Sequence, residues 1–141
     1  MRRIDELLER YGESHRNATN KAIHWICVPL IAWSLLALFW WMSPFAAYAL
    51  IALALVFYAW LSPAIAIGML GVTAVFLYAL TLLGPHALIT AIVVFVVAWI
   101  GQFIGHHIEG RKPSFFEDVK FLLVGPAWLL GHLYRKFGIA Y

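Results

Sequence analysis

Histidine is the residue type in this chain best suited to binding a metal, and four of the six histidines lie at the ends of one long uncharged stretch. Residues 22–108 contain no Asp, Glu, Lys or Arg. The N-terminal end of this stretch carries His15 and His24, and the C-terminal end carries His106 and His107. Three imidazoles with open coordination positions suit iron, zinc or copper, and spacing alone does not choose among them. The sequence therefore predicts a metal site where the fold brings these two ends together.

The composition is that of a membrane protein. The 141 residues are 64% hydrophobic and 12% charged, whereas soluble domains are about 45–50% apolar and about 25% charged. Each membrane crossing takes about 20 apolar residues, so the uncharged stretch has room for roughly four helices and for no separate soluble domain. We therefore expect a single all-α membrane domain over residues 1–141.

Prolines divide the uncharged stretch into four apolar segments. Pro44, Pro63 and Pro85 each stand where a new helix can begin, because the first turn of a helix does not use the N–H that proline lacks. The expected fold is an integral membrane bundle of four transmembrane helices. Their predicted ranges are approximately residues 22–42, 44–61, 63–83 and 85–105.

Two further helices are predicted outside the uncharged stretch. Apolar residues recur at helical spacing near the N-terminus, which predicts an amphipathic helix containing Ile4, Leu7, Leu8 and Tyr11. Near the C-terminus, residues 119–133 form a shorter apolar run that glycine and proline interrupt. This run is too short and too broken for a fifth crossing, so it predicts a re-entrant or interfacial helix packed on the bundle.

The basic residues predict the orientation and the partners. All ten Lys and Arg lie outside residues 22–108, five on each side. By the positive-inside rule both termini are cytoplasmic, which requires an even number of crossings and agrees with four. The membrane would be the bacterial inner membrane, or the endoplasmic reticulum membrane in a eukaryote. Basic ends of this kind suit anionic lipid headgroups, and no basic and aromatic interleaving typical of nucleic-acid binding is present.

This topology sorts the histidines by membrane surface. His24 opens the first span and His106 closes the fourth, so both are expected at the cytoplasmic surface, with His15 and His107 beside them. His86 begins the fourth span, roughly 30 Å from His106 at about 1.5 Å per residue. His86 is therefore excluded from any shared site.

One face of the fourth span gathers polar residues. Trp99, Gln102, His106 and Glu109 follow one another at spacings of three and four and so share a face. His107 points about 100° away from His106 if the helix continues. Glu109 has three candidate roles: a metal ligand, a hydrogen-bond partner that orients an imidazole, or a charge among the headgroups.

Gly101 and Gly105 form a small-xxx-small pattern on the same span. Small residues at this spacing let a second helix approach closely. We therefore interpret the pattern as a helix-packing surface rather than as a substrate path.

Two blocks of residues, one at each end of the uncharged stretch, resemble a known family signature. The blocks are Tyr11, His15, Asn17, Asn20, His24 and Pro29, and then Trp99, Gln102, Phe103, Gly105, His106, Glu109 and Pro113. They resemble the signature of the iron-dependent 2-hydroxy fatty acid dioxygenases, small multi-pass membrane proteins of fatty acid α-oxidation and phytosphingosine breakdown that also have bacterial relatives.

The resemblance implies an activity and a site. In this family Fe(II) and O2 cleave a 2-hydroxy fatty acid between C1 and C2, which leaves an acid one carbon shorter and CO2. The implied cofactor is Fe2+, and the motif histidines correspond to His15, His24 and His106. Two further candidate ligands stand where this chain departs from the family pattern, His107 and His132. The implied catalytic residues beside the metal are Glu109, Gln102, Asn17 and Asn20.

Two alternatives use the same residues differently. The chain could be a haem- or metal-binding membrane bundle without oxygenase activity, or a structural, lipid-organising protein whose polar residues need no metal. Haem ligands in helical bundles usually lie within the membrane and face one another across the porphyrin, whereas these histidines gather at one edge. Haem binding is therefore the less favoured use of the histidines.

Overall fold

The computed structural model describes residues 3–13, 16–110 and 122–141. All regular secondary structure in these residues is helical: α1 (Arg3–Glu13), α2 (Ala18–Met42), α3 (Pro44–Leu61), α4 (Pro63–Leu83), the 3-10 turn η1 (Gly84–His86), α5 (Ala87–Glu109) and α7 (Val124–Lys136). Within the described residues, three helical stretches are long and apolar enough to cross a membrane, Ala18–Met42, Pro44–Leu61 and Pro63–Glu109. The third stretch is α4, η1 and α5 taken together. The predicted all-α membrane architecture is confirmed at this level.

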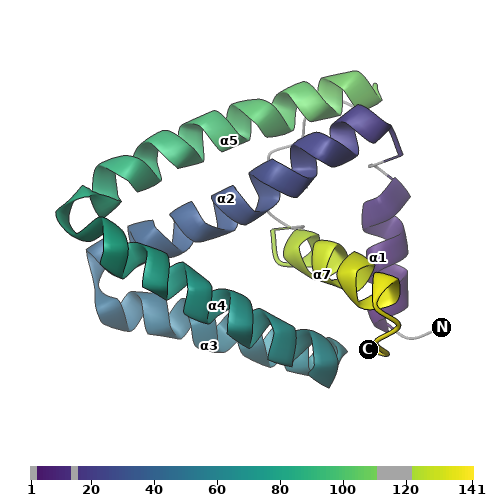
Figure 1. The fold of residues 1–141 in the computed structure, drawn as a ribbon, viewed down its shortest axis with the longest axis horizontal. Helices are drawn as coiled ribbons and strands as arrows, with labels where there is room; N and C mark the ends of the chain where they lie inside the picture. The colour runs from purple at the N-terminus through teal and green to yellow at the C-terminus, as the bar shows by residue number, and fades with distance from the viewer. Residues whose placement is uncertain (1–2, 14–15, 111–121) are drawn as a thin grey trace.

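The long helices form two arms that meet at one end in the shape of a V (Figure 1). α2 and α5 lie side by side in one arm and run in opposite directions, and α3 and α4 form the other arm. The chain passes between the arms at the vertex, once from α2 to α3 and once through η1 from α4 to α5. This arrangement brings the first residues of α2 and the last residues of α5 together at the open end of the V.

Local capping explains where the helices begin and end. The Ser43 and Ser62 hydroxyls accept the backbone N–H groups of Phe45 and Ile65, and a proline follows each serine. α3 and α4 therefore have the bounds predicted for the second and third apolar segments. α2 begins four residues earlier than predicted, because the Asn17 side chain caps it by accepting the N–H groups of Thr19 and Asn20.

The fourth apolar segment continues as a helix past residue 105. α5 ends at Glu109, and Gly110 follows it with a φ of 78°, a conformation that glycine adopts at little cost after a helix. The polar residues His106 and Glu109 are therefore held by helical backbone rather than by a loop.

Glycines let α5 pack closely on α2. A Cβ added at Gly101 would lie 2.6 Å from the Cys27 sulfur, and a Cβ at Gly105 would overlap the side-chain oxygen of Asn20. The interpretation of the small-xxx-small pattern as a helix-packing surface is thus confirmed.

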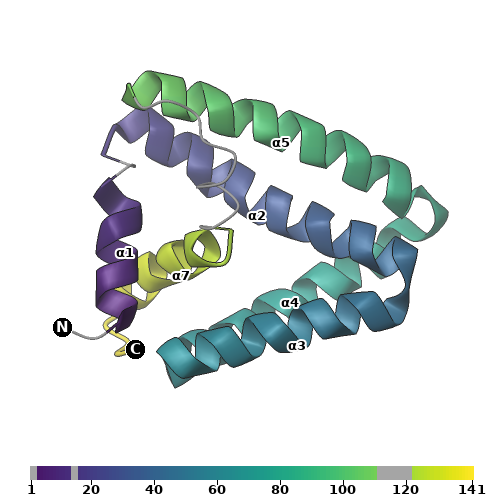
Figure 2. The same cartoon turned by 180° about the vertical axis from the view of Figure 1, so that it is seen from behind.

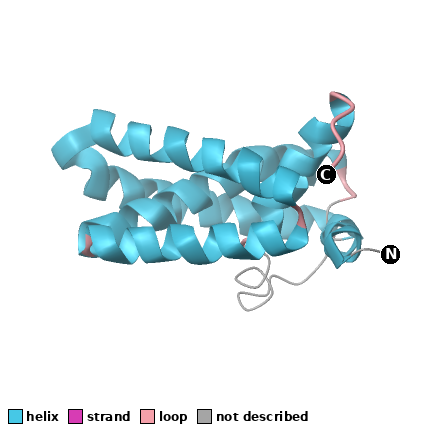
Figure 3. Ribbon diagram, turned by 90° about the horizontal axis from the view of Figure 1, so that it is seen from below, coloured by secondary structure: helices cyan, strands magenta, loops and turns pink. Residues whose placement is uncertain are grey.

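α1 and α7 occupy the open end of the V (Figures 1 and 3). α1 buries Ile4, Leu8 and Tyr11 on one face, which confirms the predicted amphipathic helix. The Tyr11 ring packs on the Trp128 ring of α7 at a centroid distance of 5.2 Å. The apolar face of α1 is therefore covered by protein through α7.

Two tyrosine hydroxyls attach α7 to the α3–α4 arm. Tyr58 donates to the carbonyl of Leu123 at 2.7 Å, and Tyr134 donates to the carbonyl of Ala64 at 2.6 Å. α7 carries most of the apolar run predicted as a re-entrant or interfacial helix, whereas residues 119–121 lie outside the described residues. Its relation to the membrane stays a prediction.

Candidate metal centre

Two buried histidines meet between α2 and α5. His24 is fully buried and His106 is 8% exposed. Their ring centroids are 5.5 Å apart and the ring planes are inclined by 78°. The two ends of the uncharged stretch therefore converge on a pair of imidazoles, as the topology predicted, while metal binding at this pair stays a prediction.

The hydrogen bond of His24 fixes which ring nitrogen carries the proton. Nδ1 lies 2.9 Å from the carbonyl oxygen of Asn20. Because a carbonyl can only accept, Nδ1 carries the proton of the neutral ring, and Nε2 is then the nitrogen that can bind a metal. The same contact recurs at His132, whose Nδ1 is 3.0 Å from the Trp128 carbonyl. A hydrogen bond from Nδ1 to a carbonyl therefore does not by itself identify a metal ligand. His24 differs from His132 because it is buried beside a second imidazole, that of His106.

Glu109 connects the end of α5 to the start of α2. Its Oε1 accepts the backbone N–H of Arg16 at 2.8 Å, and its Oε2 accepts the backbone N–H of Asn17 at 2.9 Å. The same Oε2 accepts from the Asn20 side-chain amide at 3.2 Å. A carboxylate at these N–H groups is also favoured by the positive end of the α2 dipole. These contacts are to the start of α2 rather than to an imidazole, so they give Glu109 a role outside the three candidates: it positions the helix that carries His24.

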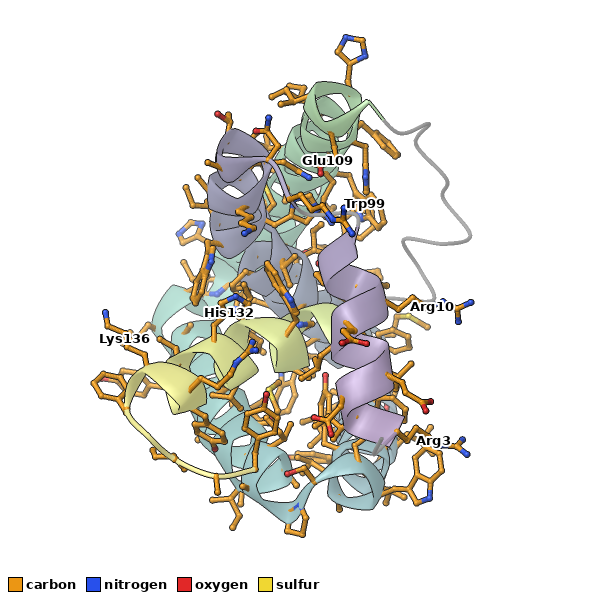
Figure 4. All side chains as sticks on the ribbon, turned by 90° about the vertical axis from the view of Figure 1, so that its right-hand side faces the viewer. Arg3, Arg10, Trp99, Glu109, His132 and Lys136 are labelled. Carbon is orange, nitrogen blue, oxygen red and sulfur yellow. The ribbon has the colours of Figure 1, made fainter. Side chains whose placement is uncertain are left out.

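The predicted polar face of α5 is turned inward. Trp99, Gln102 and His106 are all buried, and Figure 4 shows Trp99 and Glu109 on the side of α5 that faces α1. Within the described part of the chain, the buried Gln102 Oε1 has no hydrogen-bond partner. An unsatisfied buried acceptor costs about 1–3 kcal/mol. A bound molecule with a hydrogen-bond donor would therefore be stabilised at Gln102.

The structure does not bring every predicted ligand to this pair. His107 is exposed on another face of α5. His132 lies on α7 between the rings of Trp25 and Trp128, at centroid distances of 6.2 Å and 4.4 Å, and Figure 4 shows it apart from Glu109. His15 lies outside the described residues.

The donor set of the described residues is compatible with iron but incomplete. Over residues 3–13, 16–110 and 122–141, no group of three His, Cys, Asp or Glu side chains is placed to hold a metal. His24 and His106 supply two imidazoles, which suit iron. The residues present therefore fit an iron site that takes at least one further ligand. His86 is not that ligand, because it is exposed at the vertex of the V, at the far end of α5.

Two contacts of this region had no signal in the sequence. The backbone N–H groups of Arg16 and Asn17 hold Glu109, and backbone donors leave no trace in residue type. Trp25 packs its ring on that of His132, more than 100 residues away in the sequence. Both contacts depend on how the helices are arranged in space.

Glu109→Gln is expected to weaken the metal site through the start of α2. The new amide group would face N–H donors, so at least one hydrogen bond of the carboxylate is lost. Loss of a group that holds a ligand typically lowers metal affinity by about 10–100-fold, and the unmatched donors cost about 1–3 kcal/mol of stability. Fe(II) titration and thermal unfolding of the detergent-solubilised protein measure both effects.

The matched control is Glu6→Gln, because Glu6 is exposed on α1. It should leave iron affinity and melting temperature unchanged. If Glu109→Gln also leaves both unchanged, Glu109 does not position the site.

The chain matches one protein family. The family is described as 2-hydroxy-palmitic acid dioxygenase Mpo1-like, and the match covers residues 1–66 and 63–137. These two stretches together include both signature blocks and nearly the whole chain. No curated protein and no solved structure matches the chain.

Proposed function

The chain belongs to the 2-hydroxy-palmitic acid dioxygenase Mpo1-like family, and from this membership we propose that it is an Fe(II)- and O2-dependent membrane dioxygenase acting on 2-hydroxy fatty acids. The reaction cleaves the C1–C2 bond. One hydroxy acid and one O2 give a fatty acid one carbon shorter, CO2 and water. The observation that carries the proposal is the buried pair of His24 and His106 at one end of two long apolar helices.

His24 and His106 would hold the iron, with His15 as the third predicted ligand. When bound, Fe(II) would supply the redox chemistry that O2 requires. The chain's own residues do the positioning. The Asn20 carbonyl fixes the His24 ring, and Glu109 fixes the start of α2. Gln102, one turn before His106 on α5, has a buried side-chain oxygen that can accept a hydrogen bond from the 2-hydroxyl of the substrate.

We propose that α2, α3, α4 and α5 each cross the membrane and that both termini are cytoplasmic. The continuous stretch Pro63–Glu109 has 47 residues, which at about 1.5 Å per residue would extend about 70 Å, whereas the hydrocarbon core is about 30 Å thick. It turns back at η1 (Figure 1). The histidine pair then lies at the cytoplasmic edge of the bilayer, where the carboxylate of a fatty substrate resides.

The spacing of α2 and α5 counts against the haem alternative. A single methyl group added at Gly105 would overlap Asn20, so no porphyrin fits between the helices that carry the two histidines. The purified protein should therefore show no Soret band. A Soret band that disappears in His24→Ala would contradict this.

An activity assay with one defined substrate, 2-hydroxypalmitate, tests the proposed reaction. The protein is loaded anaerobically with Fe(II) and then given 2-hydroxypalmitate and O2. Mass spectrometry should detect the acid one carbon shorter. Palmitate, which lacks the 2-hydroxyl, and metal-free protein are the controls and should give none. Absence of this product from iron-loaded protein would refute the substrate class.

A further inference from the structure

Two apolar cavities lie between the arms of the V, under α7. Their volumes are about 180 Å³ and 100 Å³. Four residues line both cavities, so the two are neighbouring parts of one apolar groove: Ala32, Met69, Phe76 and Pro126. Together they remain below the roughly 300–1,000 Å³ of a compact small-molecule site. We call this combined space the inter-arm groove.

The walls of the inter-arm groove suit hydrocarbon. Its lining is apolar except for the Trp25 indole at one end and two hydroxyl groups, and both hydroxyls already donate to backbone carbonyls, Tyr58 to Leu123 at 2.7 Å and Thr73 to Met69 at 2.8 Å. Water in a space with no polar partners is unfavourable, since a buried water needs two to four of them. The expected occupant is therefore an apolar group.

The inter-arm groove is long and follows the helices. On α2 its lining extends from Trp25 to Leu36, which at about 1.5 Å per residue is about 17 Å. This is roughly half of the 30 Å hydrocarbon core of a bilayer. A narrow apolar groove of this length suits a single unbranched hydrocarbon chain.

A charged cleft adjoins the end of the inter-arm groove at Trp25. This open cleft of about 760 Å³ lies between α1, the start of α2 and α7. Its basic residues are Arg16, Lys21 and Arg135, and its acidic residues are Asp5 and Glu9. The excess of basic groups favours an anionic headgroup.

The cleft and the groove meet at one ring contact. His132 lines the cleft, and its ring packs against Trp25, which lines the groove, at a centroid distance of 6.2 Å. Lys21, which also lines the cleft, precedes His24 by one turn of α2. An amphiphile with its tail in the groove would therefore have its carboxyl end near the start of α2.

We infer that the inter-arm groove holds the acyl chain of the 2-hydroxy fatty acid, with its carboxyl end at Trp25, beside His24 on α2, and its methyl end toward Leu50 and Ile51 of α3. The basic residues of the charged cleft would attract the carboxylate to this end of the groove. This assignment rests on the proposed function for the identity of the headgroup. It makes the groove the part of the protein that selects chain length, because side chains at its far end limit how many methylenes fit.

Photo-crosslinking locates the chain directly. Full-length protein in detergent is irradiated with 2-hydroxypalmitate that carries a diazirine at the methyl end, and labelled peptides are mapped by mass spectrometry. Label is expected on groove residues of α3 and α4 such as Leu50, Ile51 and Phe76. Label confined to outward-facing residues such as Leu53 and Leu82, which are 71% and 70% exposed, would overturn the inference. So would stronger groove labelling by a phospholipid carrying the same tail.

Ala32→Leu tests the same inference through specificity. Ala32 lines both cavities, so a larger side chain there should obstruct a long chain and lower the kcat/KM ratio of C16 to C10 substrates at least tenfold. Ala49→Leu on the exposed side of α3 is the matched control and should leave the ratio unchanged. An unchanged ratio in Ala32→Leu would contradict the groove assignment.

The two proposals fail in different ways. Wild-type protein that makes no shortened acid but is labelled in the groove would refute the dioxygenase function and keep the groove. Product formation with label elsewhere would refute the groove alone. Because crosslinking uses the wild-type chain, it decides the question even if Ala32→Leu does not fold.

Discussion

His24→Ala is expected to reduce bound Fe(II) from about one ion per chain to nearly none and to abolish formation of the shortened acid. Loss of a group that merely orients a ligand costs about 10–100-fold in metal affinity, so removal of a ligand itself should exceed that range. His24 is fully buried and lies against His106, so its loss leaves one imidazole of the pair. Metal analysis of protein purified without chelators, together with turnover of 2-hydroxypalmitate, measures the effect.

Two matched histidine variants separate a local effect from a general one. His86→Ala alters an exposed histidine at the vertex and should keep wild-type iron content. His107→Ala alters the exposed neighbour of His106 and should also keep it, because α5 turns that side chain away. His24→Gln retains most of the side-chain volume, and its melting temperature checks the fold. Wild-type iron content in His24→Ala would contradict the assignment of the metal centre.

The helix bounds were largely predictable because they depend on local chemistry. The prolines that follow Ser43 and Ser62 favour the first turn of a helix, because the N–H that proline lacks is not used there. The same local reasoning underestimated the first and fourth spans. The residues at their ends, from Ala18 to Lys21 and from His106 to Glu109, were predicted as flanking sequence, although capping and hydrogen bonding keep them helical.

The V arrangement could not be predicted from the hydrophobic pattern. A membrane helix is apolar on the sides that face lipid and on the sides that face protein, so periodicity does not identify its partner. α3 and α4 show this most clearly, since nearly all their residues are apolar. The position of α7 depends on the hydroxyls of Tyr58 and Tyr134, which nothing in their sequence context marks as anchors.

The candidate site was predictable only as far as topology determines it. An antiparallel pairing of the first and fourth spans brings His24 and His106 to the same end, and the spacing along α5 places Gln102 and Glu109 on the same face. The partners of Glu109 depend on the distance between α2 and α5, and that distance depends on Gly105. Helix separation is therefore the structural variable on which the site depends most.

Gly105→Ala is expected to damage the site although alanine is the better helix former. The gain in helix propensity is about 1 kcal/mol. The added methyl group, however, would overlap the Asn20 side-chain oxygen and lie 3.2 Å from Cε1 of His24. Asn20 is fully buried and donates to Glu109, so it cannot turn aside without losing that bond. Overpacking of this kind costs about 1–3 kcal/mol.

The larger consequence of Gly105→Ala is on metal binding. If α5 moves away from α2, His106 moves away from His24, and Fe(II) affinity should fall at least tenfold in a titration followed by metal analysis. Gly71→Ala is the matched control, because a Cβ at Gly71 of α4 meets no atom within 4 Å. Gly71→Ala should retain iron affinity and melt at the same or a higher temperature. Wild-type affinity in Gly105→Ala would mean that the close approach of α2 and α5 does not determine the geometry of the histidine pair.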